Sequence, residues 1–306
     1  EINKIKQSIV NKDSVIRYNK YINFLKENFN LIGDYKTYDQ LKSAKMNLDA
    51  YIVGSDQVWN DSHTGGYDPA YLLEFAKEGK KRISYAASIG RDYFNPKYLD
   101  DYKRGLEGLD FISIRERSLI KAVEELVDTP VEVVLDPTML IEKKDYDEIK
   151  KSATIKERYI LVYMIEGNQM MVRFANRISR SLGIPLIQRR PAAKLDNELE
   201  PFYTADTGEF LGLMESAEYV ITNSFHGTVF SIIYNRPFIS MLHSDTGSRT
   251  ADLLYDLGME SHLLYDVKDF DGLDNFNIED SEKLKNKIKQ LRESSLGFLE
   301  KSLGID

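Results

Sequence analysis

The chain has 306 residues, of which 42% are hydrophobic and 29% are charged, and it contains no cysteine. The length predicts about two domains of ~150 residues, and the lack of cysteine excludes disulfides and thiolate metal sites. The formal charge of −8, from 41 basic and 49 acidic residues, argues against a nucleic-acid partner. No apolar run reaches the 18 residues of a transmembrane helix, and no signal stretch opens the chain. We therefore expect a cytoplasmic protein, for which peripheral membrane contact stays open.

In chain order, a helix comes first, and short strands then alternate with helices. Apolar runs predict strands at 49–53, 81–87, 111–114, 131–135, 159–165, 184–188, 219–222 and 237–242. Helical patterns occupy 14–29, 37–45, 97–107, 117–127, 168–182, 207–216, 224–235, 248–257 and 281–302. Because strands that alternate with helices form βαβ units, this order predicts parallel sheets.

A charged stretch at 141–158 separates two such runs. We place the domain boundary there, with one Rossmann-like domain at 1–148 and a second at 149–306 that ends in a long helix. The predicted fold class is α/β, with two doubly wound domains and a cleft between them. Ligands of such sheets bind beyond the carboxyl ends of the strands. The residues directly after each strand are therefore the candidate site residues.

In the first half, the loop "GSDQVWN" follows the strand at 49–53. Gly54 permits a tight exit from the strand, and Trp59 could stack on a sugar face. The alternative is a turn and helix cap with Trp59 in the core. The side chains that could hydrogen-bond a polyhydroxyl ligand are Ser55, Asp56, Gln57 and Asn60.

Two further strand ends in the first half carry candidates. Ser88 follows the strand at 81–87, and Arg115 follows the strand at 111–114. An ion pair of Arg115 with Glu116 or Asp136 is the structural alternative to a role in a site.

In the second half, Arg189 and Arg190 end a predicted strand, where two guanidinium groups could hold a carboxylate or phosphate. Their alternative role is an exposed, solubilising pair. Arg249 lies in the first turn of the predicted helix at 248–257 and could hold a phosphate, although a surface charge explains it as well.

The stretch "ITNSFHGTVF" is the most specific one, because a strand runs directly into a helix with a histidine in its first turn. Asn223 or Ser224 can cap this helix. The amides of His226, Gly227 and Thr228 would then favour an anion, and Gly227 would leave room for it.

Several kinds of chemistry find no signal in the sequence. It contains no HExxH, GxGxxG, Walker-type loop or nucleophile elbow. The four histidines are scattered and make no metal site. We expect neither a metal nor a cofactor.

Five motifs, "AYIVGSDQVWN", "SYAASIG", "SIRERS", "VLDPTML" and "YVITNSFHGTVFSIIYNRPFI", occur in this order. Together they resemble the polysaccharide pyruvyl transferase family over roughly residues 35–260. The resemblance implies a two-domain fold like that of GT-B glycosyltransferases. It also implies transfer of a pyruvyl group from phosphoenolpyruvate to hydroxyls of a glycan or lipid-linked sugar, which makes a pyruvate ketal in surface or exopolysaccharide biosynthesis.

Under this resemblance, the first domain is the acceptor side and the second is the donor side. Acceptor binding would fall to the loop from Gly54 to Asn60 and to Ser88. Donor binding would fall to Asn223, Ser224, Gly227, Thr228, Arg189, Arg190 and Arg249. His226 and Arg115 would be catalytic, His226 either as a general acid or as a phosphate ligand.

The chain departs from the family pattern in two places. The resemblance implies a first βα unit before the helix at 14–29, and we expect that unit to be missing from this sequence. Ser224 stands where better-studied members have an arginine two residues before the histidine, so one of the other candidate arginines would have to replace it. A GT-B-type glycosyltransferase that uses a nucleotide sugar and a catalytically idle glycan-binding member are the alternatives. The acceptor sugar and the oligomeric state stay open.

Overall fold

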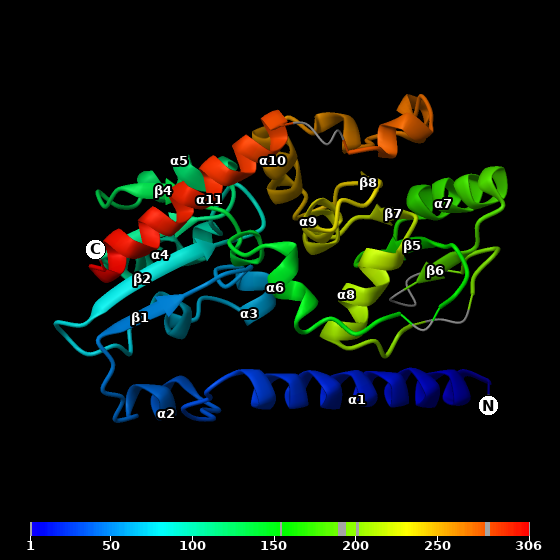
Figure 1. The fold of residues 1–306 in the computed structure, drawn as a ribbon. Helices are drawn as coiled ribbons and strands as arrows, with labels where there is room; N and C mark the ends of the chain where they lie inside the picture. The colour runs from blue at the N-terminus through cyan, green and yellow to red at the C-terminus, as the bar shows by residue number, and fades with distance from the viewer. Residues whose placement is uncertain (1, 154, 189–193, 200–201, 279–281, 306) are drawn as a thin grey trace. The chain divides into compact units, whose positions relative to one another are not determined.

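The computed structural model describes residues 2–153, 155–188, 194–199, 202–278 and 282–305. The chain forms two compact units, and each is built from three segments of sequence (Figure 1). Unit 1 holds Glu1–Gly33, Glu142–His243 and Ser261–Ile278. Unit 2 holds Asp34–Ile141, Ser244–Glu260 and Glu279–Asp306. We predicted one boundary near 148, but the first helix and two late segments cross it.

Each unit contains one four-stranded parallel sheet, which confirms the predicted α/β class with two parallel sheets and a long C-terminal helix. In unit 2 the strand order is β1-β2-β3-β4. These strands are β1 (Ala50–Val53), β2 (Lys81–Ala87), β3 (Phe111–Ile114) and β4 (Val131–Val133). The helices of unit 2 are α2 (Tyr38–Lys42), α3 (Asp61–Thr64), α4 (Leu99–Glu107), α5 (Ile120–Glu124), α10 (Ser248–Leu257) and α11 (Glu282–Leu303).

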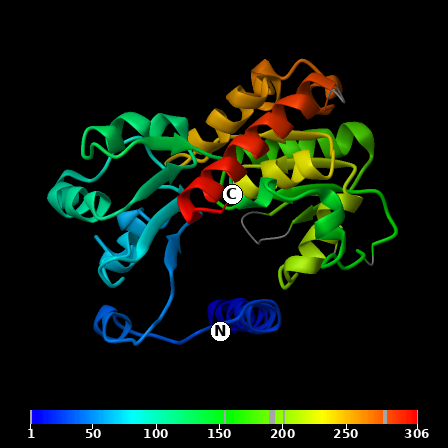
Figure 2. The ribbon, with the colours of Figure 1, turned by 60° about the vertical axis from the view of Figure 1, so that its left-hand side comes forward.

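The two late segments join unit 2 because their apolar faces pack there. Phe298 of α11 packs in one cluster with Ile83 and Tyr85 from the first sheet, that of unit 2, and with Val134 directly after β4. The Ser295 hydroxyl of α11 accepts a hydrogen bond from the Leu135 amide at 2.9 Å. α10 lies beside α11, and Figure 2 shows the pair from a second side. An amphipathic pattern predicts that a helix has a buried face, but not which sheet covers that face.

Unit 1 has the strand order β6-β5-β7-β8. The strands are β5 (Ile160–Tyr163), β6 (Leu186–Gln188), β7 (Tyr219–Thr222) and β8 (Phe238–Ser240). The helices are α1 (Ile2–Asn28), α6 (Lys143–Asp147), α7 (Gln169–Leu182), α8 (Thr207–Ser216) and α9 (Phe225–Ile233). Because β6 and β7 lie on opposite sides of β5, the strand order reverses there, and the carboxyl end of β5 is the expected ligand crevice.

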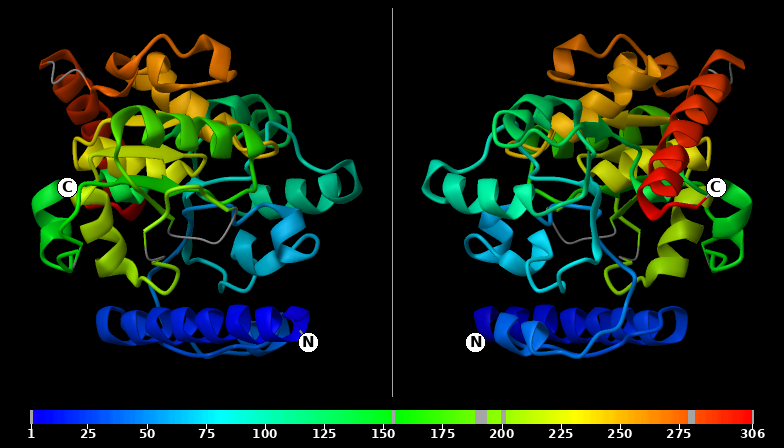
Figure 3. Two further views of the ribbon diagram at one scale, coloured as in Figure 1. Left: turned by 90° about the vertical axis from the view of Figure 1, so that its right-hand side faces the viewer. Right: turned by 90° about the vertical axis from the view of Figure 1, so that its left-hand side faces the viewer.

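The two faces of the unit 1 sheet alternate along each strand. Ile160 and Val162 pack with α7, whose Phe174 stacks on Phe276 with ring centroids 6.2 Å apart. On the other face, the Tyr159 hydroxyl donates a hydrogen bond to the Leu213 carbonyl of α8 at 2.7 Å. A salt bridge of 2.8 Å between Lys20 and Glu209 ties the long α1 to α8, and Figure 3 shows α1 along its length.

Candidate functional site

Polar side chains gather in unit 2 just beyond the carboxyl ends of the four parallel strands. Asp56 follows β1, Ser88 follows β2, Arg115 and Glu116 follow β3, and Asp136 comes soon after β4. Because parallel strands end at the same edge of a sheet, these residues come together although up to 80 positions separate them. Hydrogen bonds and ion pairs connect all of them.

Arg115 is the centre of this cluster. Its side chain is only 2% exposed and pairs with the equally buried Asp136 at 2.7 Å. It also contacts the Asp56 carboxylate at 3.1 Å. Burial alone would lower the pKa of Arg115, but the carboxylates of Asp136, Glu116 and Asp56 outweigh burial and raise the pKa. Arg115 is therefore a fixed positive charge, and the ion pair with Asp136 that we gave as its structural alternative is present.

Arg249 reaches the same carboxylate from α10. Its Nη1 lies 3.1 Å from the Asp56 oxygen that Arg115 also contacts. With its side-chain oxygen turned toward Arg249, Gln57 accepts from both terminal nitrogens at 2.9 and 3.0 Å. Burial and then the charge of Arg115 lower the pKa of Arg249. We assigned Asp56 and Gln57 to the acceptor and Arg249 to the donor, but the structure brings all three together in unit 2.

Glu116 is the residue that the sequence analysis missed as part of a site. Its fully buried carboxylate accepts hydrogen bonds from the Ser88 hydroxyl at 2.7 Å and from the amides of Ile89 and Gly90 at 3.2 and 3.1 Å. Burial raises the pKa of this carboxyl, and Arg115 opposes that effect. Its position directly after Arg115 at a strand end was the signal that could have found it.

The cluster brings charged groups of both signs together in a mostly buried place. Two guanidinium groups face three carboxylates, and of these five groups only Asp56 is well exposed, with 58% of its side chain accessible. Buried guanidinium groups are strong ligands for carboxylate and phosphate, because low local polarity strengthens charged hydrogen bonds. The arrangement can therefore bind an anion at the position of the Asp56 carboxylate.

Some residues of the predicted acceptor loop have structural roles instead. Trp59 is 1% exposed and donates its indole N–H to the Tyr71 carbonyl at 3.0 Å, so the prediction that it stacks on a sugar is wrong. A Cβ on Gly54 would lie 1.9 Å from the Tyr85 carbonyl oxygen, and the φ of Gly54 is +123°, so the backbone requires glycine at this position. Asn60 is buried and caps α3 through the Ser62 amide. Ser55 is half-buried.

Ser88 also differs from its predicted role. Its hydroxyl is fully buried and donates to Glu116, so an acceptor cannot reach it directly. Ser88 instead holds the loop that follows β2, since the Gly90 amide donates to the same hydroxyl oxygen at 3.0 Å.

In unit 1, the predicted helix with the histidine is α9, and it begins directly after β7. Ser224 is its N-cap and accepts from the Gly227 amide at 3.3 Å. Asn223 links this turn to the chain after β5, because it donates to the Glu166 carbonyl and accepts from the Ile165 amide, both at 2.8 Å. His226 is half-buried in the first turn. His226 thus follows the end of β7 closely in the chain, and β7 is the neighbour of β5, where the strand order reverses.

The anion site predicted on the first amides of α9 needs correction. The Gly227 amide donates to the Ser224 side chain, and the Thr228 amide donates to the Ser224 carbonyl at 3.0 Å. A Cβ on Gly227 would lie 2.2 Å from the Thr222 hydroxyl oxygen, so this glycine serves the packing of helix on strand rather than room for a ligand. The Thr228 side chain is fully buried and its hydroxyl lies 2.6 Å from that of Ser240.

The remaining predicted donor residues are the two adjacent arginines after β6. Arg189 and Arg190 lie outside the described residues.

Within the described part of the chain, no group of three or more His, Cys, Asp or Glu side chains could hold a metal ion. No helix in that part is long and apolar enough to cross a membrane.

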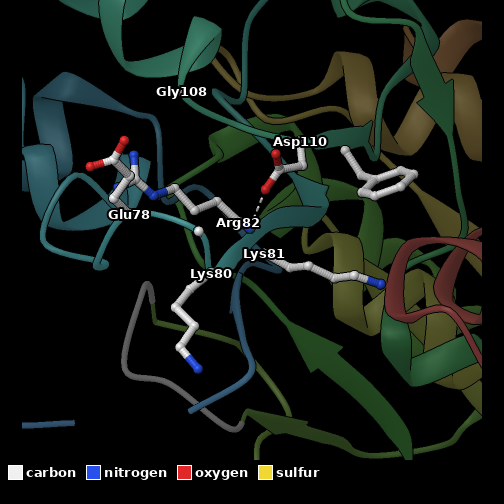
Figure 4. A pocket seen from close by; sticks show the side chains of 8 residues that line it. Glu78, Lys80, Lys81, Arg82, Gly108 and Asp110 are labelled. Carbon is white, nitrogen blue, oxygen red and sulfur yellow. Dashed lines mark hydrogen bonds between the residues drawn. The ribbon is translucent and has the colours of Figure 1, made fainter. Parts of the chain in front are cut away.

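Two of the cavities among the described residues are not lined by the arginine cluster. One, of about 430 Å³, opens at the amino ends of β2 and β3 (Figure 4). Its cations already have partners, since Lys81 donates to the Ser302 carbonyl at 3.0 Å and Lys80 lies 3.5 Å from Asp49. The other, of about 460 Å³, lies in unit 1 and is lined by Tyr18, Tyr21 and Tyr163 among others.

The chain is an α/β protein with two parallel sheets, and arginines and carboxylates gather beyond the strand ends of one of them. A family model described as polysaccharide pyruvyl transferase matches residues 4–245. The chain therefore belongs to the polysaccharide pyruvyl transferase family, as its motifs predicted.

Among solved structures, the chain is similar to one described as a "putative UDP-N-acetylglucosamine 2-epimerase from Listeria monocytogenes", with 12% identity and a TM-score of 0.45. That likeness covers 94% of this chain and 77% of the other. The comparison with curated proteins found no match.

Proposed function

We propose that this protein transfers the pyruvyl group of phosphoenolpyruvate onto two hydroxyls of a glycan or glycan precursor and forms a pyruvate ketal. Membership of the family supports a pyruvyltransferase role in general. The donor and the kind of acceptor are what the family resemblance implies, and the roles of single residues are our inference from the chemistry of the site.

The observation that carries the proposal is the convergence of Arg115 and Arg249 on one carboxylate oxygen, each 3.1 Å away. Phosphoenolpyruvate carries a carboxylate and a phosphate, and the planar fork of arginine suits both. We propose that Arg249 supplies the function of the family arginine that Ser224 replaces. It already shares its target with Arg115, which the family resemblance makes catalytic.

The reaction needs an acid as well as an anion site. The oxygen of the first acceptor hydroxyl bonds to C2 of the donor, its proton leaves to a base, and the methylene carbon takes a proton. The C2–O bond to phosphate then breaks, the second hydroxyl takes that place, and its proton leaves with inorganic phosphate. His226 is our candidate for the acid, because an imidazole titrates near neutral pH.

The direct test is to incubate the purified chain with phosphoenolpyruvate and a glycan acceptor. We expect release of inorganic phosphate, with a pyruvate ketal on the glycan by mass spectrometry. Arg249→Lys should lower the rate strongly, since lysine keeps the charge but loses the fork. Arg173→Lys on the exposed side of α7 is the matched control and should leave the rate unchanged.

A thermal-shift screen separates the alternatives, because a ligand of the native state raises the melting temperature. Stabilisation by phosphoenolpyruvate supports the proposal. Stabilisation by a nucleotide sugar but not by phosphoenolpyruvate would point to a glycosyltransferase, and stabilisation by glycan alone would point to a non-catalytic binding protein.

A further inference from the structure

Asp56 occupies an unusual place in the arginine cluster. Its Oδ1 accepts from both Arg115 and Arg249, yet 58% of its side chain is exposed while theirs are 2% and 7% exposed. The two buried guanidinium groups are therefore aimed outward, at a position that a solvent-facing carboxylate fills. A carboxylate or phosphate of a substrate would make the same pair of charged hydrogen bonds.

The backbone of Asp56 is held independently of its side chain. The Asp56 carbonyl accepts from the Ser88 amide at 3.0 Å and from the Val58 amide at 2.8 Å, and the residue forms a bridge with Ala87. Its φ is +68°, in the left-handed region that aspartate tolerates better than most residues. The carboxylate can thus leave the arginines by rotation about its Cα–Cβ bond, with no movement of the main chain.

The arginines also have supports that do not involve Asp56. Asp136 holds Arg115 at 2.7 Å, and Gln57, in the orientation given above, holds Arg249 at 2.9 Å. The Glu116 carboxylate also lies 3.9 Å from Nε of Arg115. These contacts would keep both guanidinium groups aimed at the same position once the Asp56 carboxylate had left it.

We propose that Asp56 is an internal anion, which the carboxylate or phosphate of the donor displaces, and which then acts as the general base on the acceptor hydroxyl. This role rests on the proposed function. The released carboxylate takes the hydroxyl proton as the hydroxyl oxygen bonds to C2 of the donor, while the acid delivers a proton to the methylene carbon. One residue would thereby link arrival of the donor to activation of the acceptor.

The proposal predicts an unusual pair of effects for Asp56→Asn. The amide has the shape of the carboxylate but no charge, so an added anion no longer competes with it. Affinity for an anion should rise by roughly 5- to 150-fold, the range typical of coupling between two ligands. Turnover should fall by roughly 10²–10⁴, the usual contribution of a positioned general base. A residue with only a structural role would weaken binding or leave it unchanged.

The experiment measures binding of inorganic phosphate, pyruvate and phosphoenolpyruvate to the full chain by calorimetry at one fixed ionic strength, because salt screens such contacts. Phosphate and pyruvate show which group of the donor takes the place of Asp56. Asp128→Asn, an exposed aspartate of unit 2, is the matched control for loss of one negative charge. Asp56→Ala is a second variant and should bind these anions more tightly as well.

Equal or weaker binding of all three anions by Asp56→Asn, in folded protein, would overturn the internal anion. Tighter binding with unchanged turnover would overturn the general base. Failure of the proposed function looks different. In that case the variant binds phosphate or pyruvate more tightly, but wild-type protein forms no ketal.

Discussion

Arg115 and Arg249 contact the same carboxylate, but their removal should have very different effects on stability. In Arg115→Met the partner that stays behind is Asp136, whose side chain is 1% exposed. In Arg249→Met the partner is Asp56, which is 58% exposed and keeps its contact with Arg115. A buried charge that loses its partner is costly, whereas an exposed one is solvated by water.

The size of the difference follows from these burials. Leaving a buried carboxylate without its guanidinium costs about 3–5 kcal/mol, although the Thr138 amide and hydroxyl still donate to Asp136 at 3.0 and 2.6 Å. For domains of 150–250 residues this lowers the melting temperature by roughly 6–20 °C. Loss of Arg249 should cost about 1 kcal/mol or less, as for other ion pairs with an exposed partner.

Thermal and urea unfolding of both variants, beside wild type, make the measurement. The double variant Arg115→Met/Asp136→Asn is the control, and it should recover part of the lost stability because no unpaired charge stays buried. Equal losses for the two single variants would refute this reasoning, and so would a double variant no more stable than Arg115→Met. Both single variants should bind phosphate more weakly than wild type.

Three further predictions concern other residues. Trp59→Phe should lower the unfolding free energy by about 1–3 kcal/mol through the lost hydrogen bond to Tyr71 and the smaller ring, and it should not change glycan affinity. In the wild type, tryptophan fluorescence that responds to a glycan would contradict the core position of Trp59. His226→Gln should leave the melting temperature within a few degrees but lower turnover by roughly 10²–10⁴, and an active but destabilised variant would remove His226 from the catalytic residues. Burial lowers the pKa of His262, which lies against Phe238. As the pH falls, the unfolded state therefore binds a proton at this histidine before the folded state does, and the unfolding free energy should fall below about pH 6.5. In His262→Phe this part of the pH dependence should disappear.

The sequence predicted the elements well because most of the strands are buried on both faces. The strands at 81–87, 111–114 and 219–222 and the helices at 207–216 and 248–257 have the predicted bounds. Long-range partners were harder to predict. Nothing local in α10 shows that Arg249 returns to the first sheet, where the Asp252 carboxylate of the same helix accepts from the Ser118 amide at 2.9 Å.

The sequence predicted which residues belong to the candidate site, but not which of them lie together. Asp56, Gln57, Arg115 and Arg249 were all found from their positions after strands and at a helix start. Their assembly around one carboxylate needed the strand register and the return of α10. Trp59 was misjudged because a polar loop surrounds it in sequence, whereas its ring turns inward to Tyr102 and Leu72 in the core.

The return of α11 to unit 2 also bears on how the protein is made. The face of the first sheet that Phe298 covers is complete only after α11 has left the ribosome. At the usual rate of synthesis, the four strands of that sheet wait about 10–30 s for this helix. During that time Ile83 and Tyr85 expose an apolar surface that other nascent chains or a chaperone can reach. Variants that shorten or weaken α11 should therefore reduce the yield of soluble protein in cells more than they reduce the activity of the molecules that do fold.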